Sequence, residues 1–377
     1  MATKRPKIPE EVRLKLWVLS GGRCEFPGCN KQVWKDGLTL KDDNFAHMAH
    51  LVAASPDGPR GDKTLSPKLA TDFSNLMLVC LTHSKLIDGK HKSEYTIEML
   101  REYKERHESR IRMQTSVGPD MGTTVMRFVA HIRERKMSIS TAQAYEALDQ
   151  RFPSDDKGIL IDLTSREHGA GKSYWNGFKS DINEKVRSGL TMGNDHKRVE
   201  HLSIFAIAPI PLLIYLGNRI GGTTPTDIYQ KHRDTDDWKW RRDPRRGTFG
   251  YIVRKSARKK GAKRVALILS LSGQVNHADV KKAVGNVPWY EITIHKPDRD
   301  YLKRRSQLVM FAEKYREVLT DIRTLYGGDS EIVLFPAIPV SVAIACGREL
   351  LPKSDPRLVV YDNTNDKGGF VETLKIN

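Results

Sequence analysis

The sequence predicts two domains of different fold class: a small α+β domain at the N-terminus and a larger α/β domain with a mainly parallel sheet. Two observations support this division. Closely spaced cysteines and histidines gather in the first 112 residues, and beyond residue 201 short apolar runs alternate with helical stretches. A chain of 377 residues is long enough for two or three domains. Alternating strands and helices predict parallel strands that are covered on both faces.

The boundary between the domains is predicted from composition. A charged stretch over 95–112 has apolar residues at helical spacing and predicts a helix at the end of the first domain. A polar stretch with two glycines and a proline follows at 115–122 and predicts a linker. We therefore place the first domain at residues 1–114 and the second at 123–377.

The elements of the second domain follow from its apolar periodicity. Between 123 and 200 we predict two amphipathic helices, over 127–135 and 142–152, and a short strand that begins at Ile159. Beyond 201, five short apolar runs predict buried strands and two longer amphipathic stretches predict helices. The strands are 204–208, 265–270, 289–294, 332–335 and 358–361, and the helices are 301–326 and 340–351.

The charge of the chain predicts a polyanionic partner. The sequence has 63 Lys and Arg against 46 Asp and Glu, a net charge of +17, which favours nucleic acid, nucleotides or an anionic membrane as partners. The segment Lys231–Arg264 alone holds 14 basic and 4 acidic residues, a net charge of +10. This basic segment is either a solvated loop or an electrostatic surface for a phosphodiester.

The apolar stretches and the cysteines indicate the compartment. The most apolar stretch, Phe205–Gly217, is too short to span a bilayer and contains two prolines. The basic N-terminus is not followed by the apolar segment of a signal peptide. Four cysteines in so long a chain do not form a disulfide framework. We therefore expect a cytoplasmic protein without a membrane partner.

Two residue pairs in the first domain have the spacing of a zinc site. Cys24 and Cys29 bracket four residues, and Cys80 and His83 form a second pair about 50 residues later. Three thiolates and one imidazole complete a tetrahedral Zn²⁺ shell that leaves no position open for a substrate. We therefore predict a structural zinc ion. Without it, a domain this small and polar would bury too little apolar surface to be stable.

A second pattern lies between these pairs. His50 follows Ala-His-Met-Ala, and Asn75 stands five residues before Cys80 and is followed by leucine. This pattern resembles the motif of HNH endonucleases, which have a ββα-metal fold pinned by a zinc knuckle. The resemblance implies that His50 is the general base that deprotonates a water and that Asn75 is the motif asparagine. It also implies a divalent ion such as Mg²⁺ that neutralises charge on the phosphorane.

The chain departs from that motif at two positions. Many HNH nucleases have an acidic metal ligand before the base histidine and a histidine after the second knuckle ligand, where this chain has Ala49 and Ser84. The substitutes that we name as ligands of the catalytic metal are His47 and Asp88. A surface role or a role in supporting the zinc site is equally open for His47.

A basic loop follows the predicted base. Arg60 and Lys63 in its Gly-Pro-Arg-Gly-Asp-Lys segment have the charge that contacts with DNA phosphates require. A zinc module that binds without cutting is the alternative explanation of the whole set.

The second domain contains the same type of strand-to-helix turn twice. At both places an apolar strand runs into a turn with two prolines and then into an apolar helix. Such turns place backbone N–H groups at the carboxyl edge of a parallel sheet, where nucleotides and phosphates bind. Coincidental packing is the other explanation. The pocket residues predicted on this ground are Pro209, Ile210, Pro211 and Leu212 at the first turn, and Ala337, Pro339 and Ser341 at the second.

Aromatic residues alternate with cations between the two turns. Such a mixture suits a pocket that stacks bases and pairs with phosphates, although tryptophans two positions apart are more often packing residues. The further candidates for ligand binding are Tyr229, Gln230, His232, Arg233, Trp238 and Trp240.

These features of the second domain together resemble a SAVED domain. The resemblance implies two fused CARF-like units of Rossmann type that sense cyclic oligonucleotides. An HNH domain followed by a SAVED domain is similar to the nuclease effectors of CBASS, a bacterial anti-phage system. This implies a cyclic di- or trinucleotide activator such as cGAMP, double-stranded DNA as the substrate, and a homo-oligomer: a dimer that assembles further when the ligand binds.

Two other functions are compatible with the same residues. One is a stand-alone restriction-type HNH nuclease whose C-terminal half reads DNA. The other is a non-catalytic, zinc-dependent regulator that binds nucleic acid. Sequence-specific fragments would favour the first, and DNA binding without nicking would favour the second.

Overall fold

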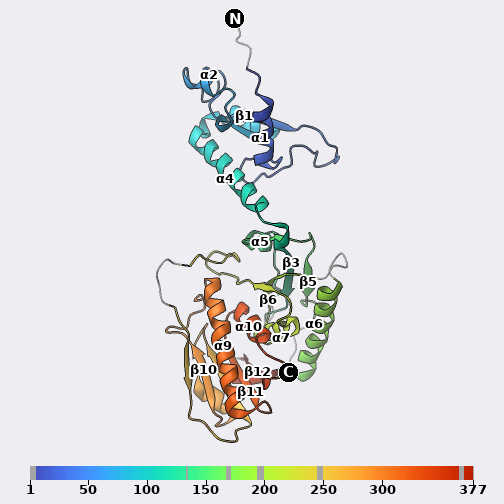
Figure 1. Cartoon of the computed structure of the whole chain (residues 1–377), viewed down its shortest axis with the longest axis vertical. Coiled ribbons are helices and arrows are strands. Elements are labelled where there is room, and N and C mark those ends of the chain that lie inside the picture. The colour runs from blue at the N-terminus through green and yellow to red at the C-terminus, as the bar shows by residue number, and fades with distance from the viewer. Residues whose placement is uncertain are drawn as a thin grey trace. The chain divides into compact units, whose positions relative to one another are not determined.

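A computed structural model describes residues 6–132, 135–166, 171–192, 199–243, 249–364 and 369–376. The chain divides into two compact units, Met1–Pro119 and Asp120–Asn377, called unit 1 and unit 2 below (Figure 1). Each unit has its own apolar core, so each is described by itself.

Unit 1 is built around a two-stranded antiparallel hairpin. Strand β1 (Ala46–His50) pairs with β2 (Leu76–Cys80), so that Ala46 lies opposite Cys80 and His50 opposite Leu76. Strand β2 is buried along its whole length and forms the centre of the core. The helices around the hairpin are α1 (Glu10–Ser20), α2 (Leu65–Leu69), α3 (Leu81–Asp88) and α4 (Ile97–Thr115), with short 3₁₀ turns at Phe73–Asn75 and Lys92–Glu94.

Helix α4 agrees with the helix predicted over 95–112. Thr96 begins it as an N-cap, because its hydroxyl oxygen accepts a hydrogen bond from the Met99 amide at 3.2 Å. The helix continues to Thr115, and a 3₁₀ turn at Pro119–Met121 leads into unit 2.

Unit 2 begins with a parallel sheet. Strand β3 pairs with β4 and β5 on one side and with β6 on the other, and β6 pairs with β7. All of these pairings are parallel. The elements of this first half are β3 (Gly122–Val129), α5 (Thr141–Ala147), β4 (Phe152–Pro153), β5 (Ile159–Asp162), α6 (Lys172–Met192), β6 (Leu202–Ile207), α7 (Ile210–Ile220) and β7 (Thr226–Ile228).

The second half of unit 2 has a six-stranded sheet in the order β13-β12-β11-β9-β10-β8. The four central strands are parallel, and the two outer strands, β8 and β13, are antiparallel to their neighbours. Its elements are β8 (Ile252–Lys255), β9 (Arg264–Ser270), α8 (His277–Val284), β10 (Trp289–Thr293), α9 (Arg305–Tyr326), β11 (Glu331–Ala337), α10 (Val340–Arg348), β12 (Arg357–Thr364) and β13 (Gly369–Ile376).

The two halves repeat one topology. The order β7-β6-β3-β5 in the first sheet corresponds to β12-β11-β9-β10 in the second. In both sheets the chain leaves the central strand toward one side and then crosses to the other side. This confirms the prediction of an α/β domain made of two similar units.

Helices α7 and α10 pack against each other through glycine (Figure 1). A Cβ atom at Gly217 would lie 2.1 Å from the Ile344 carbonyl oxygen, and one at Gly347 would lie 1.8 Å from the Ile214 carbonyl oxygen. The contact is reciprocal, as the repeated topology requires. Although α7 begins within the most apolar stretch of the sequence, no helix among the described residues is both long and apolar enough to cross a bilayer.

Most of the predicted elements of unit 2 are confirmed, and one is wrong. The five strands beyond residue 201 and the helices that follow β10 and β11 lie where the periodicity predicts them. Of the helix predicted over 127–135, residues 127–129 are instead the end of β3, residues 130–132 and 135 belong to no helix, and residues 133 and 134 lie outside the described part. Arg127 made this strand look amphipathic. Its guanidinium is accommodated by donating to the Thr141 hydroxyl at 2.5 Å and the Ile139 carbonyl at 3.4 Å.

Candidate functional site

The hairpin of unit 1 brings the four predicted zinc ligands together. The Cys24, Cys29 and Cys80 sulfurs and a His83 ring nitrogen all lie within 4.8 Å of one another. Cys80 ends β2 and His83 lies in the first turn of α3, so one strand-to-helix junction supplies two of the donors. The knuckle between Cys24 and Cys29 turns through Gly28, which has φ +78°. Residues predicted from spacing alone therefore form one cluster.

The ring of His83 is held in place by stacking. Phe26, from the knuckle, lies parallel to it with ring centroids 4.1 Å apart and 5° between the planes. Nδ1 of His83 lies 3.3 Å from Cys80 Sγ and 3.5 Å from Cys24 Sγ. Burial lowers the pKa of His83, which favours the neutral imidazole that can donate a lone pair to a metal. Three sulfurs and one nitrogen match the donor set of a closed zinc site.

The predicted base, His50, ends strand β1. Its Nε2 lies 2.9 Å from the Ala70 carbonyl oxygen at the end of α2. A carbonyl oxygen can only accept, so Nε2 carries the hydrogen, and Nδ1 holds the lone pair of the neutral ring. The contact orients the imidazole as a general base requires.

Asn75 binds the backbone around this histidine. Its Oδ1 accepts a hydrogen bond from the Val52 amide at 2.8 Å, and its Nδ2 donates to the Val52 and Leu69 carbonyls at 2.8 and 3.1 Å. Because Asn75 is 3% exposed and its amide is used within the domain, the structure gives it a positioning role. His50 and Asn75 thus hold neighbouring carbonyls, those of Ala70 and Leu69, at the end of α2.

Arg60 lies inside unit 1 and clamps the end of β1 to α3. Its side chain is 8% exposed. Nε donates to the Leu51 carbonyl at 2.8 Å, Nη1 to the Ile87 carbonyl at 2.8 Å, and Nη2 to Asp88 Oδ1 at 2.7 Å. A guanidinium used in this way is not available to a DNA phosphate, so we no longer assign Arg60 to that role. Lys63 is exposed and remains a candidate.

The candidates for the catalytic metal are not brought together. Successive side chains of a strand point to opposite faces, so His47 and His50, three positions apart on β1, lie on opposite faces of the hairpin. The carboxylate of Asp88 is paired with Arg60. Among the residues that the structure describes, the cysteine–histidine cluster is the one group of three or more metal-ligating side chains.

The second predicted site lies at the carboxyl edge of unit 2. Prolines 209 and 339 precede the first residues of α7 and α10, which start where β6 and β11 end. The Ala337 carbonyl accepts hydrogen bonds from the Leu271 and Ser272 amides at 3.0 and 2.8 Å. The loops after β9 and β11 therefore meet where the strand order reverses, which is where open α/β sheets bind ligands.

Two of the predicted pocket residues contact each other across the halves. Gln230 follows β7, and its Oε1 accepts hydrogen bonds from the Ser341 hydroxyl at 2.7 Å and the Ser341 amide at 3.3 Å. Ser341 lies in the first turn of α10 and is fully buried. The contact thus satisfies an N–H group of that helix and joins the first half of unit 2 to the second.

Three other predicted pocket residues lie in the core and pack against protein side chains. Tyr229 is 3% exposed and stacks on Phe205 with centroids 4.3 Å apart, and Trp238 is 1% exposed against the same ring. His232 is 3% exposed. The spacing of these aromatic residues is therefore explained by packing. Of the other predicted pocket residues, Arg233 is exposed, and Pro209, Ile210 and Trp240 are half-buried. Pro211, Leu212 and Pro339 are buried, and Ala337 is half-buried.

Sequence reasoning missed cations that the topology places at the same edge. His295, Lys296 and Arg299 follow β10, and Arg135 and Lys136 come a few residues after β3. Lys296, Arg299, Arg135 and Lys136 are all exposed. The available signal was a basic residue directly after a buried apolar strand, since the ends of parallel strands share one edge.

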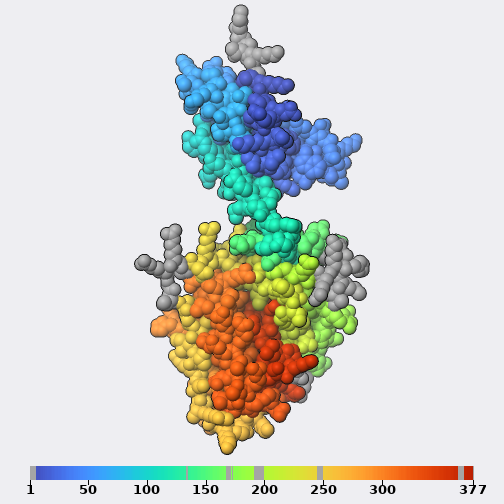
Figure 2. All heavy atoms as spheres, viewed as in Figure 1, coloured from blue at the N-terminus to red at the C-terminus, as the bar shows by residue number. Residues whose placement is uncertain are grey.

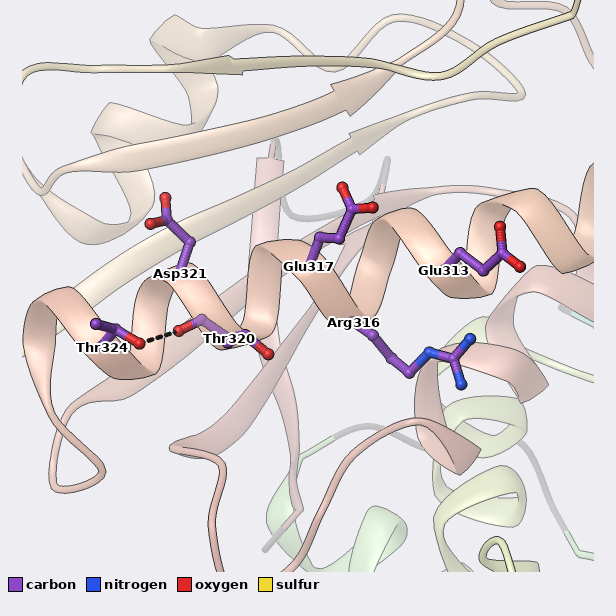
Figure 3. Close-up of a pocket in the computed structure, with 6 residues that line it drawn as sticks. All are labelled: Glu313, Arg316, Glu317, Thr320, Asp321 and Thr324. Atoms are coloured by element: carbon purple, nitrogen blue, oxygen red, sulfur yellow. Dashed lines mark hydrogen bonds between the residues drawn. The ribbon is translucent and has the colours of Figure 1, made fainter.

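A shallow hollow on the outer face of α9 does not fit an anionic ligand. Glu313, Glu317 and Asp321 project from one side of the helix, and Arg316 from the other (Figure 3). Asp321 accepts hydrogen bonds from the Tyr290 hydroxyl at 2.7 Å and from Lys255 at 3.0 Å. Three carboxylates repel phosphates, so we assign no nucleotide to this surface.

One family model matches the chain. Its description is "SMODS-associated and fused to various effectors sensor domain", abbreviated SAVED, and it matches residues 182–376. The match begins within α6 and ends with β13, so it includes both proline-bearing strand-to-helix turns. No curated protein matches the chain.

Solved structures of SAVED/CARF-domain receptors are similar to the chain. The Acinetobacter baumannii Cap4 receptor with the cyclic trinucleotide 3'3'3'-cAAA is 14% identical, with a TM-score of 0.47 over 78% of this chain and 62% of that chain. The same receptor with 2'3'3'-cAAA is 14% identical, with a TM-score of 0.47 over 84% of this chain and 66% of that chain. The Moraxella osloensis Cap4 receptor is 13% identical, with a TM-score of 0.44 over 73% of this chain and 54% of that chain. The chain thus spans less than two thirds of the first of these structures.

Proposed function

Since the chain belongs to the SAVED family of sensor domains, we propose that it is a cyclic-oligonucleotide-activated HNH endonuclease that degrades double-stranded DNA in CBASS anti-phage defence. The observation that carries the sensor half is the family match over residues 182–376. The nuclease half rests on His50, held by a backbone carbonyl on a hairpin whose other strand ends in the cysteine–histidine cluster.

The sensor site that we propose is the carboxyl edge of unit 2. Helix N-termini carry partial positive charge and free N–H groups, which suit phosphates. The exposed cations Lys296 and Arg299 lie at the same edge and can pair with the phosphates of a cyclic di- or trinucleotide, such as a cGAMP-like activator. Because the site includes loops from both halves of unit 2, a bound ligand contacts both and can change how they pack.

The chemistry of unit 1 would start at His50. With Nε2–H donated to Ala70, Nδ1 is the atom that takes a proton from water as its oxygen attacks the phosphorus. The P–O bond to the leaving sugar oxygen breaks, and that oxygen takes a proton from solvent. Asn75 and Arg60 contribute by holding the backbone directly after the histidine, at Val52 and Leu51. Lys63 is exposed and suited to contact a DNA phosphate.

The cluster of Cys24, Cys29, Cys80 and His83 fits a structural Zn²⁺ ion. Its four donors are of the type and proximity that closed zinc sites use. The ion would hold the knuckle against the start of α3 and supply folding free energy to unit 1.

The predicted catalytic Mg²⁺ is supported by fewer suitable ligands than the structural Zn²⁺. Mg²⁺ keeps several waters and binds through one or two carboxylates together with substrate phosphates. The described residues near His50 offer Asp88 as such a carboxylate, and it is paired with Arg60. We therefore assign no residue to this ion and derive no step through it.

In the absence of ligand, the equilibrium must strongly favour the inactive state, because an unregulated nuclease would degrade the genome of its own cell. Shifting a population from 1:99 to 99:1 requires about 5.5 kcal/mol of differential ligand binding. We propose that the ligand promotes assembly of a homo-oligomer, which brings unit 1 domains into an active arrangement. A multiply charged ligand that contacts both halves of unit 2 can supply this difference in binding free energy between the inactive and active states.

The test is cleavage of supercoiled plasmid DNA with Mg²⁺, alone and with a panel of cyclic di- and trinucleotides. We expect cutting only with a matching ligand. His50→Ala should abolish cleavage while zinc content and ligand binding stay unchanged. His47→Ala, on the opposite face of the same strand, is the matched control and should retain cleavage.

Three results would contradict the proposal. Cleavage that is indifferent to every ligand would remove the sensor role and favour a stand-alone nuclease. DNA binding without any nicking would favour a regulator. Full activity of His50→Ala would show that another group is the base.

A further inference from the structure

The last part of the basic segment, the turn 256–263, lies at a different edge of its sheet from the sensor site. Strand β8 is antiparallel to β10, with Lys255 opposite Tyr290 and Ile252 opposite Thr293. The C-terminal end of β8 therefore lies where the parallel strands begin. The turn 256–263 joins that end to the first residue of β9, so it lies wholly at the amino edge of the sheet. The sensor loops leave the opposite edge. Residues 244–248 of the segment are outside the described part.

The turn is anchored against the ends of two helices. Lys259 Nζ donates to the Asn286 carbonyl at 2.5 Å, just after α8, and Arg258 Nη2 donates to the Leu325 carbonyl at 3.0 Å, in the last turn of α9. These contacts give the turn a defined place at the edge. Figure 2 shows its golden surface at the lower end of unit 2.

Lysines from three connections gather at this edge. They are exposed, and within the described part of the chain no carboxylate lies within ion-pair distance of any of them. Lys281 and Lys282 lie in the last turn of α8, where cations also favour the helix dipole, but the other four belong to no helix. We call this set the amino-edge lysines: Lys259, Lys260, Lys263, Lys281, Lys282 and Lys353.

The carboxylates of the same edge are already neutralised. Glu331 lies 2.9 Å from Arg264, and Asp355 lies 3.1 Å from Arg323. Asp329 is exposed and is the exception. Among the described residues, six lysines against one unpaired carboxylate leave a local positive excess that faces away from the sensor edge.

The chemistry of this surface suits the backbone of duplex DNA. Lysines are flexible point charges without the planar fork that reads bases or clamps one anion, so they favour sequence-independent phosphate contacts. Five neighbouring strands at about 4.8 Å spacing make the edge about 19 Å wide. A duplex carries a charge about every 1.7 Å of its axis, so a segment of that length presents on the order of ten phosphates.

We propose that the amino-edge lysines of unit 2 form a second, sequence-independent DNA-binding surface, separate from both the nuclease hairpin and the activator site. It shares the DNA partner of the proposed function but does not depend on cleavage. It would raise the affinity of the full chain for DNA and keep the substrate bound while the sensor edge stays free for the ligand.

The test measures binding of a fluorescent 30-base-pair duplex to the full chain without divalent metal, across a series of salt concentrations. Lys260→Gln with Lys263→Gln should weaken binding at least tenfold at low salt. It should also lower the slope of log affinity against log salt by about 1.8, because each phosphate contact contributes about 0.9. Lys281→Gln with Lys282→Gln is an independent variant of the same edge and should act likewise.

The matched control is Lys185→Gln with Arg187→Gln, two exposed cations of α6. It removes the same charge and should leave affinity and slope near those of the unaltered chain. Binding of the activator should be unchanged in all three variants.

The proposal is overturned if the amino-edge variants keep the affinity and slope of the unaltered chain, or if the control loses as much as they do. It is also overturned if they change only the mass of the protein in light scattering, which would assign the surface to a second copy. None of these results bears on the cleavage assay with His50→Ala, so the two proposals fail separately.

Discussion

At the scale of single residues, the two largest revisions concern side chains that sequence reasoning placed on DNA or on a ligand. Arg60 and Trp238 are a cation and an aromatic residue in loops, the types that commonly contact nucleic acid. Both lie inside the protein, at 8% side-chain exposure for Arg60 and 1% for Trp238. Long amphipathic side chains can be buried when their polar atoms find backbone partners, as those of Arg60 do.

Arg60→Ala should destabilise unit 1 locally. It removes hydrogen bonds to the backbone carbonyls of His50, Leu51 and Ile87 and leaves the Asp88 carboxylate without its partner, for which we expect a loss of about 2 kcal/mol. Hydrogen exchange of the β1 amides should accelerate roughly thirtyfold. Arg60→Lys should not restore protection, because an ammonium cannot make the forked contacts. Lys63→Ala, three residues away and exposed, is the control. Equal hydrogen-exchange protection of the β1 amides in Arg60→Ala and Lys63→Ala would show that Arg60 does not hold β1 to α3.

Cys29→Ser should remove one bound zinc per chain. Only three donors of the cluster would remain, and unit 1 should lose protection because the ion supplies folding free energy. The measurement is zinc content by mass spectrometry of the purified protein. Cys346→Ser is the matched control, because Cys346 is buried in α10 and lies outside the cluster. Retention of a full equivalent of zinc by Cys29→Ser would contradict the assigned ligand set.

At the scale of elements, packing decides where the helices of unit 2 cross. Gly217 and Gly347 occupy equivalent positions, seven residues after the first residues of α7 and α10. Each lets the other helix approach at its backbone. Glycine normally weakens a helix interior, so its presence here is explained by the close crossing and not by helix propensity.

Gly217→Ala and Gly347→Ala should each destabilise unit 2 by about 2 to 3 kcal/mol. The added methyl would meet a carbonyl oxygen of the other helix at 2.1 or 1.8 Å, which forces the backbones apart. Urea unfolding of the whole chain, followed in unit 2, measures the loss. Gly222→Ala is the control, because nothing lies within 4 Å of its added methyl. It should be neutral or slightly stabilising. Equal stability of all three variants would show that the helices can move apart at little cost.

At the scale of the whole molecule, charged contacts join the two halves of unit 2. Arg305 at the start of α9 pairs with Asp227 on β7, and Arg151 Nε and His201 Nε2 lie 3.4 and 3.8 Å from the same carboxylate. Asp227 is 8% exposed. Because this carboxylate pairs with cations from both halves, it links the two sheets. Any movement of one half relative to the other would stretch or break these ion pairs.

Asp227→Ala should destabilise unit 2 by about 2 kcal/mol, because Arg151, whose side chain is 22% exposed, would lose its counter-charge, whereas water screens the loss at Arg305, whose side chain is 58% exposed. Urea unfolding of the whole chain, followed by hydrogen exchange of β7 and α9, measures the effect. Asp236→Asn removes the charge of an exposed carboxylate that pairs with Lys231 and keeps a side chain that tolerates the left-handed backbone at φ +52°, so it should cost less than about 1 kcal/mol. An equal loss in the two variants would contradict the role of Asp227 at the junction.

The sequence predicted what depends on periodicity and on rare residue types. Five strands beyond residue 201 and two helices followed from short apolar runs, and the cluster of three cysteines and His83 followed from spacing alone. The prediction failed where one residue disturbed a pattern, as Arg127 does in β3, and for elements with weak periodicity. The edge strand β8, which is exposed at all four positions, is an example.

By itself, the sequence determined the two-unit plan, the metal-type cluster and the pair of strand-to-helix turns, because these depend on local spacing and on which residues are apolar. Only the tertiary structure decided which polar and aromatic side chains face solvent. Burial is set by contacts between segments far apart in the chain, which is why Arg60 joins β1 to α3 and Trp238 packs on Phe205. For the same reason the basic turn lies at the amino edge of its sheet, opposite the sensor loops, a position fixed by strand order and direction.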